Sequence, residues 1–127
     1  MKALVVDDDS MNRELLRRML FRLGFSVDDA KDGRSAIKAC AGSPYDIVLL
    51  DLLMPDVNGA EAARAIRAFY AERGRAPCVI AVTGSVCEGE AAAVFDSVLP
   101  KPFVLEELSA SIVEGLASRG MRPAGPG

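Results

Sequence analysis

The chain has 127 residues, of which 50% are hydrophobic and 26% charged, and its formal net charge is −3. This length and composition predict one soluble domain with a core of its own. Acidic and basic residues are mixed along the chain, which argues against direct nucleic-acid binding, and the absence of histidine excludes Ser-His and Cys-His catalysis and most transition-metal sites.

The first half of the chain alternates strand and helix patterns. A short apolar run predicts a strand at Ala3–Val6. Ser10 is a good N-cap for the helix that follows, in which apolar residues recur at helical spacing as far as Leu23. A weaker strand is predicted at Phe25–Val27, followed by a second helix over residues 32–41.

The second half repeats this alternation. Asp46–Leu50 is continuously apolar after its first residue, which is typical of a parallel strand covered on both faces. A helix is predicted over residues 58–73 and a strand at Cys78–Val82. A short helix near Glu88–Val94 and a brief strand at Val98–Leu99 then precede a final helix, which is lined by Leu105, Leu108, Ile112 and Leu116.

Five strand–helix units predict an α/β fold, with a five-stranded parallel sheet that is doubly wound and has helices on both faces. We expect this domain to span residues 1–119 and the Gly- and Pro-rich residues 120–127 to form a disordered tail.

No apolar run suits a membrane span or a signal peptide, so we expect a cytoplasmic location and no membrane partner. Three cysteines without a C-x-x-C pair are predicted to be buried reduced thiols: Cys40, Cys78 and Cys87.

Polar residues stand where the predicted strands end. Asp7 and Asp8 follow the first strand, Asp51 the third and Thr83 the fourth, and Lys101 comes just after the fifth. Because ligands of open parallel sheets bind at the carboxyl ends of the strands, we expect these side chains to meet at one edge.

The charges at this edge predict a divalent cation. Three aspartates and one lysine leave a net negative charge that such a cation would neutralise, and Mg²⁺ prefers oxygen ligands of this kind. Its usual chemistry beside carboxylates is phosphoryl transfer, for which Asp51 would be the nucleophile. Lys101 and the Thr83 hydroxyl would then contact the phosphoryl oxygens. Each of these residues alone has an ordinary structural explanation. A functional site is favoured because all of them are expected at the same edge of the sheet.

Four short stretches resemble the receiver domain of two-component response regulators: VVDDDS at 5–10, DLLMPDVNG at 51–59, AVTGS at 81–85 and LPKPF at 99–103. The resemblance extends to about Arg119 and implies a flavodoxin-like fold with strand order 2-1-3-4-5. It implies that Asp51 is the phosphoacceptor, and that Asp7 and Asp8 hold Mg²⁺ together with the backbone carbonyl of Leu53.

The resemblance also assigns the remaining positions. Thr83 corresponds to the switch hydroxyl and Lys101 to the lysine that contacts the phosphoryl group. The Lys101–Pro102 bond is expected to be cis, which proline permits at low cost. Val98 stands where many members carry an aromatic switch residue, so a ring-based relay through this position is not expected. Asp9 receives no ligand role.

The family takes its phosphoryl group from a phosphohistidine on a histidine kinase or histidine phosphotransfer domain. We expect this partner to dock near Met11, Asn12 and Leu15, and phosphorylation to change contacts with a downstream protein target. The chain could be a stand-alone regulator, a phosphorelay member, or a piece of a larger regulator or hybrid kinase. Either a monomer or a phosphorylation-linked dimer is compatible with the sequence.

Two other functional classes compete with this interpretation. Asp7-x-Asp9 after an apolar strand resembles haloacid-dehalogenase-type phosphatases, in which Asp7 would be the nucleophile. The chain is short for that family, and Met11 stands where a threonine or valine is usual. The second competitor is a pseudo-receiver that docks partners without being phosphorylated, against which the complete set of acidic residues and lysine argues.

Overall fold

The computed structural model describes residues 1–52, 54, 58–73, 77–84 and 93–118. Its centre is a parallel sheet of five strands in the order β2-β1-β3-β4-β5, which confirms the predicted α/β architecture and strand order. The strands are β1 (Lys2–Val6), β2 (Ser26–Ala30), β3 (Ile47–Asp51), β4 (Cys78–Thr83) and β5 (Ser97–Pro100).

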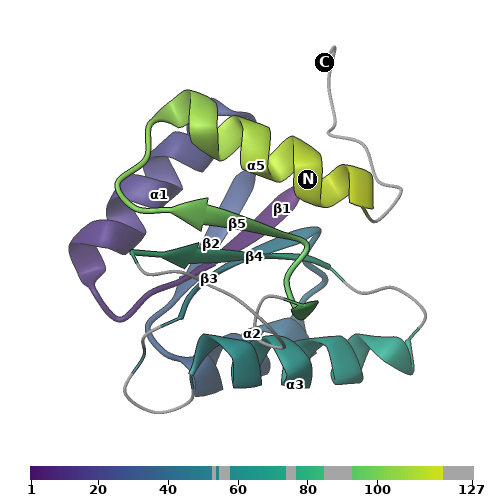
Figure 1. Ribbon diagram of the computed structural model, residues 1–127. Coiled ribbons are helices and arrows are strands. Elements are labelled where there is room, and N and C mark those ends of the chain that lie inside the picture. Colours follow the sequence, from purple (N-terminus) through teal and green to yellow (C-terminus); the bar gives the residue numbers. More distant parts are fainter. Residues whose placement is uncertain (53, 55–57, 74–76, 85–92, 119–127) are drawn as a thin grey trace.

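Helices cover both faces of the sheet, as predicted (Figure 1). Within the described residues, α1 (Ser10–Arg22) and α5 (Leu105–Ser118) lie on one face, and α2 (Gly33–Gly42) and α3 (Gly59–Ala71) lie on the other. The helix expected near Glu88–Val94 falls mostly outside the described residues, and so do the tail 120–127 and Cys87. None of the described helices is both long enough and apolar enough to span a membrane.

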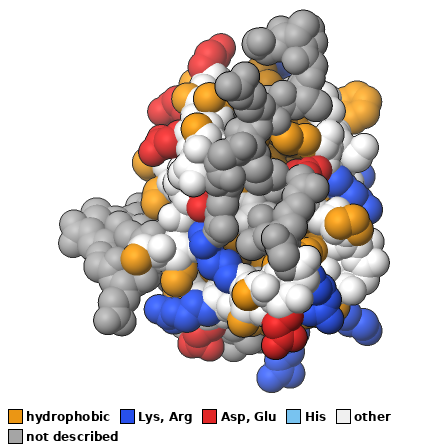
Figure 2. All heavy atoms as spheres, turned by 90° about the vertical axis from the view of Figure 1, so that its right-hand side faces the viewer, with side chains coloured by type: hydrophobic (Ala, Val, Ile, Leu, Met, Phe, Trp, Pro, Cys, Tyr) orange, Lys and Arg blue, Asp and Glu red, His pale blue; other side chains and the backbone are white. Residues whose placement is uncertain are grey.

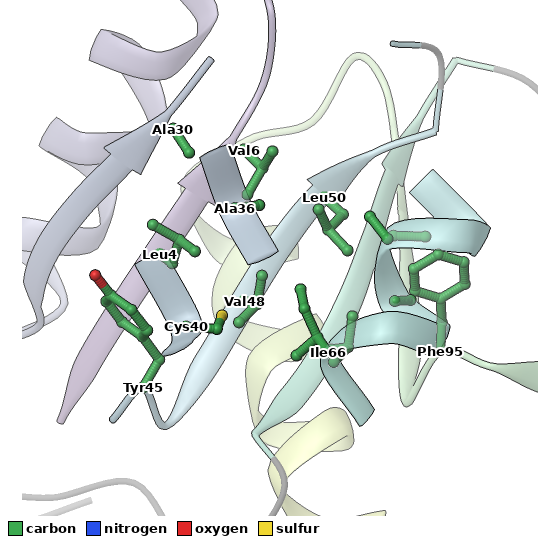
Figure 3. Packing of buried hydrophobic residues seen from close by; sticks show 14 of the residues in the cluster. Leu4, Val6, Ala30, Ala36, Cys40, Tyr45, Val48, Leu50, Ile66 and Phe95 are labelled. Atoms are coloured by element: carbon green, nitrogen blue, oxygen red, sulfur yellow. The ribbon is translucent and has the colours of Figure 1, made fainter. Parts of the chain in front are cut away.

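A separate hydrophobic cluster fills each side of the sheet. Figure 3 shows the α2–α3 side, where Leu4, Val48 and Leu50 from the strands face α2 and α3. The other cluster joins Val5, Leu49 and Ile80 to residues of α1 and α5. The central strands thus bury side chains on both faces, which explains why β3 and β4 read as continuous apolar runs.

Several predicted boundaries lie one to three residues from the observed ones, and two of these differences have a clear cause. The N-cap of α1 is Asp9 rather than Ser10, and the Asp9 carboxylate accepts hydrogen bonds from the backbone N–H groups of Met11 and Asn12. The second strand runs from Ser26 to Ala30 instead of over Phe25–Val27, because pairing with β1 continues as far as Val6 and Ala30. The cap was misplaced because Asp9 and Ser10 are both good N-caps, and the strand was misplaced because β2 is a polar edge strand with a weak sequence signal.

Helix α5 packs on the sheet through Leu108, Ile112 and Leu116, and it approaches β4 most closely at Gly115. A Cβ atom at Gly115 would come within 2.6 Å of the Cys78 sulfur. The hydroxyl of Ser97 on β5 donates to the Ser111 carbonyl at 2.8 Å. Cys78 and, on α2, Cys40 are buried and form no disulfide within the described residues, as predicted, and burial raises the pKa of the Cys40 thiol to about 12. A larger residue at Gly115 would require the Cys78 side chain or α5 itself to shift.

Carboxylates at the beginnings of the strands have hydrogen-bond donors. Asp46, which precedes β3, accepts from the backbone N–H of Lys2 at 2.8 Å. Asp96, which precedes β5, accepts from the backbone N–H of Val79 at 2.7 Å and from Arg67 at 3.1 Å. Figure 2 looks toward the side where β4 and β5 begin, and it shows acidic and basic side chains interspersed there. These contacts hold the strand starts in register.

Candidate functional site

The register of the sheet brings the predicted site residues together. Val6 pairs with Leu50, so the next residues, Asp7 and Asp51, lie side by side at the ends of adjacent strands. Asp51 pairs with Val82, which places Thr83 one residue beyond it on β4. Thr83 in turn pairs with Pro100, the residue before Lys101. Three neighbouring strand pairs therefore build one site at the carboxyl edge of the sheet.

Three carboxylates form the centre of this site. Asp7, Asp8 and Asp51 each offer one oxygen, and these oxygens all lie within 4.8 Å of one another. The Lys101 Nζ atom lies 3.6 Å from Asp7 Oδ2 and 3.9 Å from Asp51 Oδ2. Asp7 is 1% exposed and Asp8 is exposed, while the Asp51 side chain is 12% exposed. One lysine cannot balance three carboxylates, so the site keeps a negative excess beside a reachable Asp51.

Asp7 is the best candidate for a metal ligand in this cluster. Its Oδ1 atom accepts a hydrogen bond from the Asp9 N–H at 2.9 Å. Its Oδ2 atom is buried and, among the described residues, has no hydrogen-bond partner. Buried polar atoms are rarely left unsatisfied in proteins, and an oxygen of this kind is a suitable ligand for a hard cation. The residues present therefore fit Mg²⁺.

The segment after Asp51 returns closely to β3. A Cβ atom at Gly59 would lie 2.6 Å from the Asp51 carbonyl oxygen, so this approach requires glycine. The Gly59 N–H donates to the Leu52 carbonyl at 3.2 Å, and Asn58 caps α3 by accepting from the Glu61 N–H at 2.9 Å. Together these contacts position Asp51 relative to α3. Leu53 lies outside the described residues, so the role of its carbonyl stays a prediction.

Thr83 and Lys101 are linked through the backbone. Thr83 is buried, and its carbonyl accepts a hydrogen bond from the Lys101 N–H at 2.8 Å. The Lys101–Pro102 peptide bond is cis. Val98 is half-buried and packs against the α2–α3 side of the core. A displacement of Thr83 would therefore be transmitted directly to the segment that carries the lysine.

One contributor to the site was not predicted from the sequence. Arg13 on α1 donates to the Asp7 carbonyl at 2.7 Å and to Asp29 Oδ2 on β2 at 3.1 Å. It thereby fixes the start of α1 to the end of β1. A charged residue in the first turns of a helix carries no sequence signal for this role, because the contact depends on where β2 lies.

Two of the three expected docking residues, Asn12 and Leu15, line a groove beside the site. Met11 is 80% exposed and Leu15 is 55% exposed, whereas Asn12 is half-buried. A groove of about 330 Å³ runs between α1 and the residues after β5, and its lining includes Asn12, Leu15, Lys101 and Phe103.

Comparison with known proteins identifies the family. The model of the response regulator receiver domain matches residues 3–113. The chain belongs to the response regulator receiver family. This receiver domain is thus a module of two-component signalling, in agreement with the resemblance seen in its four motifs.

Individual relatives agree with the family model. The response regulator MprA of Mycolicibacterium vanbaalenii is 43% identical over 111 residues, which cover 86% of this chain and 47% of that protein. The chain spans about half the length of the curated relatives of this type.

Solved structures show the same fold. The response regulator TrrA of Thermotoga maritima, in complex with Mg²⁺ and BeF, has a TM-score of 0.81 and 31% identity, covering 91% of this chain and 98% of that one. The receiver domain of Ssk1 from Saccharomyces cerevisiae, solved with the histidine phosphotransfer protein Ypd1, has a TM-score of 0.80 and 26% identity, covering 93% and 91%.

Proposed function

We propose that this receiver domain accepts a phosphoryl group on Asp51 from a phosphohistidine of a partner protein. The observation that carries the proposal is the carboxylate cluster around Asp51, in which Asp7 Oδ2 is buried without a hydrogen-bond partner among the described residues. Such a cluster is poorly balanced alone and becomes balanced when a cation and a phosphoryl group join it. The domain is a phosphoacceptor that assists its own phosphorylation and dephosphorylation.

The proposed metal ligands are Asp7, Asp8 and Asp51, with the backbone carbonyl of Leu53 as a further one. Bound Mg²⁺ would neutralise charge on the phosphoryl oxygens during transfer. The similarity to TrrA, which was solved with Mg²⁺ and BeF, supports this assignment.

The chain's own side chains would carry the transfer. An Asp51 carboxylate oxygen forms the new P–O bond as the P–N bond to the partner's imidazole breaks, and the imidazole nitrogen keeps the electron pair of that bond. Lys101, whose Nζ atom already lies 3.9 Å from Asp51 Oδ2, pairs with a phosphoryl oxygen. The Thr83 hydroxyl donates a hydrogen bond to another. A phosphate adds about −1.5 to −2 charge, by analogy with phosphoserine, and this draws both side chains inward.

The proposed partners are proteins. A histidine kinase or histidine phosphotransfer domain would dock against Met11, Asn12 and Leu15, and the similarity to Ssk1 in its complex with Ypd1 supports a partner of this class. The output would be a changed affinity for a downstream protein target through the surface around β5 and α5. Because Val98 has no ring to rotate, this output would rely on Thr83 rather than on an aromatic switch.

The remaining assignments concern the extent and location of the domain. We place the receiver at residues 1–119, followed by a tail at 120–127, in the cytoplasm and without a membrane partner of its own. Direct nucleic-acid binding is not assigned to these residues. Any DNA-binding or other output belonging to a longer regulator would come from residues outside this receiver.

Incubation with phosphoramidate and Mg²⁺, followed by intact-mass measurement, tests the assignment. We expect the wild-type chain to gain one phosphoryl group and Asp51→Asn to gain none. Labelling of Asp51→Asn at Asp7, with turnover of a phosphate monoester that is lost in Asp7→Asn, would instead support the phosphatase alternative. A folded wild-type chain that takes up no label would support a docking-only receiver.

The metal assignment has its own matched pair of variants. Asp8→Ala should abolish the Mg²⁺ dependence of labelling, because it removes a proposed ligand. Asp9→Asn should be labelled like the wild type, since it deletes a neighbouring charge but keeps a residue that caps helices equally well. Equal Mg²⁺ dependence in the two variants would contradict the role given to Asp8.

A further inference from the structure

The outer surface of the α1–α5 layer is divided by charge. Helix α1 exposes Arg17, Arg18 and Arg22, with Glu14 as its one acidic residue. Helix α5 exposes Glu106, Glu107 and Glu114, and its sequence from Leu105 to Ser118 contains no basic residue. Both helices pack on the same face of the sheet, so one layer presents a cationic helix and an anionic helix to its surroundings.

Contacts within the chain leave much of this charge uncompensated. Glu14 pairs with Arg18 at 3.0 Å and with Arg17 at 3.5 Å, so its single charge is shared between two arginines. Within the described part of the chain, Arg22 forms no ion pair, and neither do Glu106 and Glu114. A positive excess therefore remains on α1 and a negative excess on α5.

The two helices are also complementary in side-chain size. On α1, Met11, Leu15 and Phe21 are exposed, Phe21 to 76%. On α5, the exposed surface carries the smaller residues Ala110, Val113 and Ala117, which lie three or four positions apart and so share one helix face. Large apolar side chains on one helix thus match a shallow acidic surface on the other, as ridges match grooves in helix packing.

We propose that a second copy of this chain packs on this layer, with α1 of each copy against α5 of the other. A two-fold interface makes both contacts at once, because the same surface of each copy is used. The alternative two-fold arrangement would place α1 on α1 and α5 on α5, opposing like charges. Charge complementarity therefore selects the α1–α5 pairing.

This interface has a consequence for the proposed phosphodonor. The α1 surface that it covers includes Met11 and Leu15, which are also assigned to docking of the phosphohistidine partner. The dimer and the donor complex would then exclude each other. The dimer itself rests on no part of the proposed phosphorylation, so its test needs neither Mg²⁺ nor a phosphodonor.

Sedimentation velocity across a concentration series of the full chain tests the proposal. We expect the wild type to form a dimer at low ionic strength. Raising the ionic strength from about 0.1 M to about 1 M shortens the Debye length from about 10 Å to about 3 Å and should weaken the dimer. A wild-type chain that stays monomeric throughout the low-salt series would overturn the proposal.

Charge reversal identifies the surfaces involved. Arg18→Glu with Arg22→Glu places acid opposite acid, and Glu106→Arg with Glu114→Arg places base opposite base. Each double variant alone should associate at least about tenfold more weakly than the wild type, because like charges opposed across an interface repel strongly. Lys38→Glu with Arg64→Glu, on the opposite helix layer, changes the net charge as the arginine variant does and should dimerise normally. Dimerisation of either reversed variant at wild-type strength would refute the assigned surface.

A mixture of the two reversed variants gives the sharpest result. In the mixed dimer, the acidic α1 of one variant meets the basic α5 of the other, and the second contact joins a native α1 to a native α5. Mixing should therefore restore dimers that neither variant forms alone, with circular dichroism confirming that both are folded. A mixture of folded variants that remains monomeric would contradict the proposed pairing.

Discussion

At the amino end of the sheet, Asp46 and Asp96 each accept a hydrogen bond from a backbone N–H group, whereas at the carboxyl end Asp7, Asp8 and Asp51 cluster together, with Lys101 beside Asp7 and Asp51. The former carboxylates are matched by donors from neighbouring strands and helices. In the latter group, Asp7 Oδ2 is buried without a hydrogen-bond partner among the described residues. The same residue type therefore has two different roles in one sheet.

The difference shows how a structural carboxylate can be told from a functional one. Burial alone does not separate them, because Asp7 is more buried than Asp96. Hydrogen-bond donors do separate them: Asp46 and Asp96 accept from backbone N–H groups and stabilise the fold, whereas Asp7 stands in a carboxylate cluster and keeps one oxygen without a hydrogen-bond partner among the described residues, which suits it to bind a cation. Three experiments can break or sharpen this comparison.

Removal of a carboxylate that accepts hydrogen bonds at the amino end of the sheet should have the largest effect on stability. Asp96→Ala deprives the Val79 N–H and the half-buried Arg67 of their acceptor, and it should lower the free energy of unfolding by about 3 kcal/mol. Urea denaturation measures this loss. Asp8→Ala, its counterpart at the other end, should stay within about 0.5 kcal/mol of the wild type in metal-free buffer. Equal losses in both variants would erase the distinction between the two ends.

Addition of Mg²⁺ should have an effect of slightly smaller size and only at the carboxyl end. At about 100 times its dissociation constant, a ligand of the folded state raises the free energy of unfolding by about 2.7 kcal/mol. We expect this rise in the wild type and in Asp96→Ala, as measured by thermal melts with and without Mg²⁺. The rise should vanish in Asp8→Ala, and its persistence there would move the metal away from the cluster.

The smallest expected effect concerns Asp28 on β2. The Tyr45 hydroxyl donates to Asp28 at 2.7 Å and, as the main cause, lowers the pKa of this carboxyl below its usual 3.8, with Lys2 contributing. Because Asp28 is half exposed, Tyr45→Phe should destabilise the chain by only about 0.5 kcal/mol near neutral pH.

The pH dependence of that difference has a definite sign. A lowered carboxyl pKa contributes stability above its unfolded value, and the contribution disappears as pH falls through the folded pKa. In contrast to Asp28, Tyr45 has a raised pKa, mainly because it is buried, so its hydroxyl stays protonated and able to donate until strongly alkaline pH. The wild type and Tyr45→Phe should therefore converge in stability below about pH 3.8. A gap that widened in acid would contradict the hydrogen bond.

The sequence predicts the sheet and the position of the site because both depend on local patterns. Continuous apolar runs marked β3 and β4 as buried parallel strands, and the polar residues that end the strands had to meet at one edge. Asp7, Asp51, Thr83 and Lys101 were therefore found without knowledge of the fold's details. The position of each of these residues at the sheet edge depends only on strand order and strand direction.

Features that depend on distant contacts could not be predicted. Strand β2 has the polar sequence SVDDA, and its two aspartates are stabilised by Tyr45 and Arg13 from other elements. The cap of α1 was misassigned because Asp9 and Ser10 are both good caps, and only the backbone geometry decides between them. The role of Arg13 was missed for the same reason that the end of β2 was misplaced, since its partners are Asp29 on β2 and the Asp7 carbonyl just after β1.

Because α5 packs closely over Cys78, the reactivity of this thiol would report detachment of the helix from the sheet. Cys78 lies on β4 beneath Gly115, and its buried thiol forms no disulfide within the described residues. A thiol reagent would reach the sulfur while α5 is lifted from the sheet, so the rate of alkylation would count those openings. Because Thr83 ends the same strand, an event at the carboxyl edge that loosens α5 could be timed at Cys78 without any added probe.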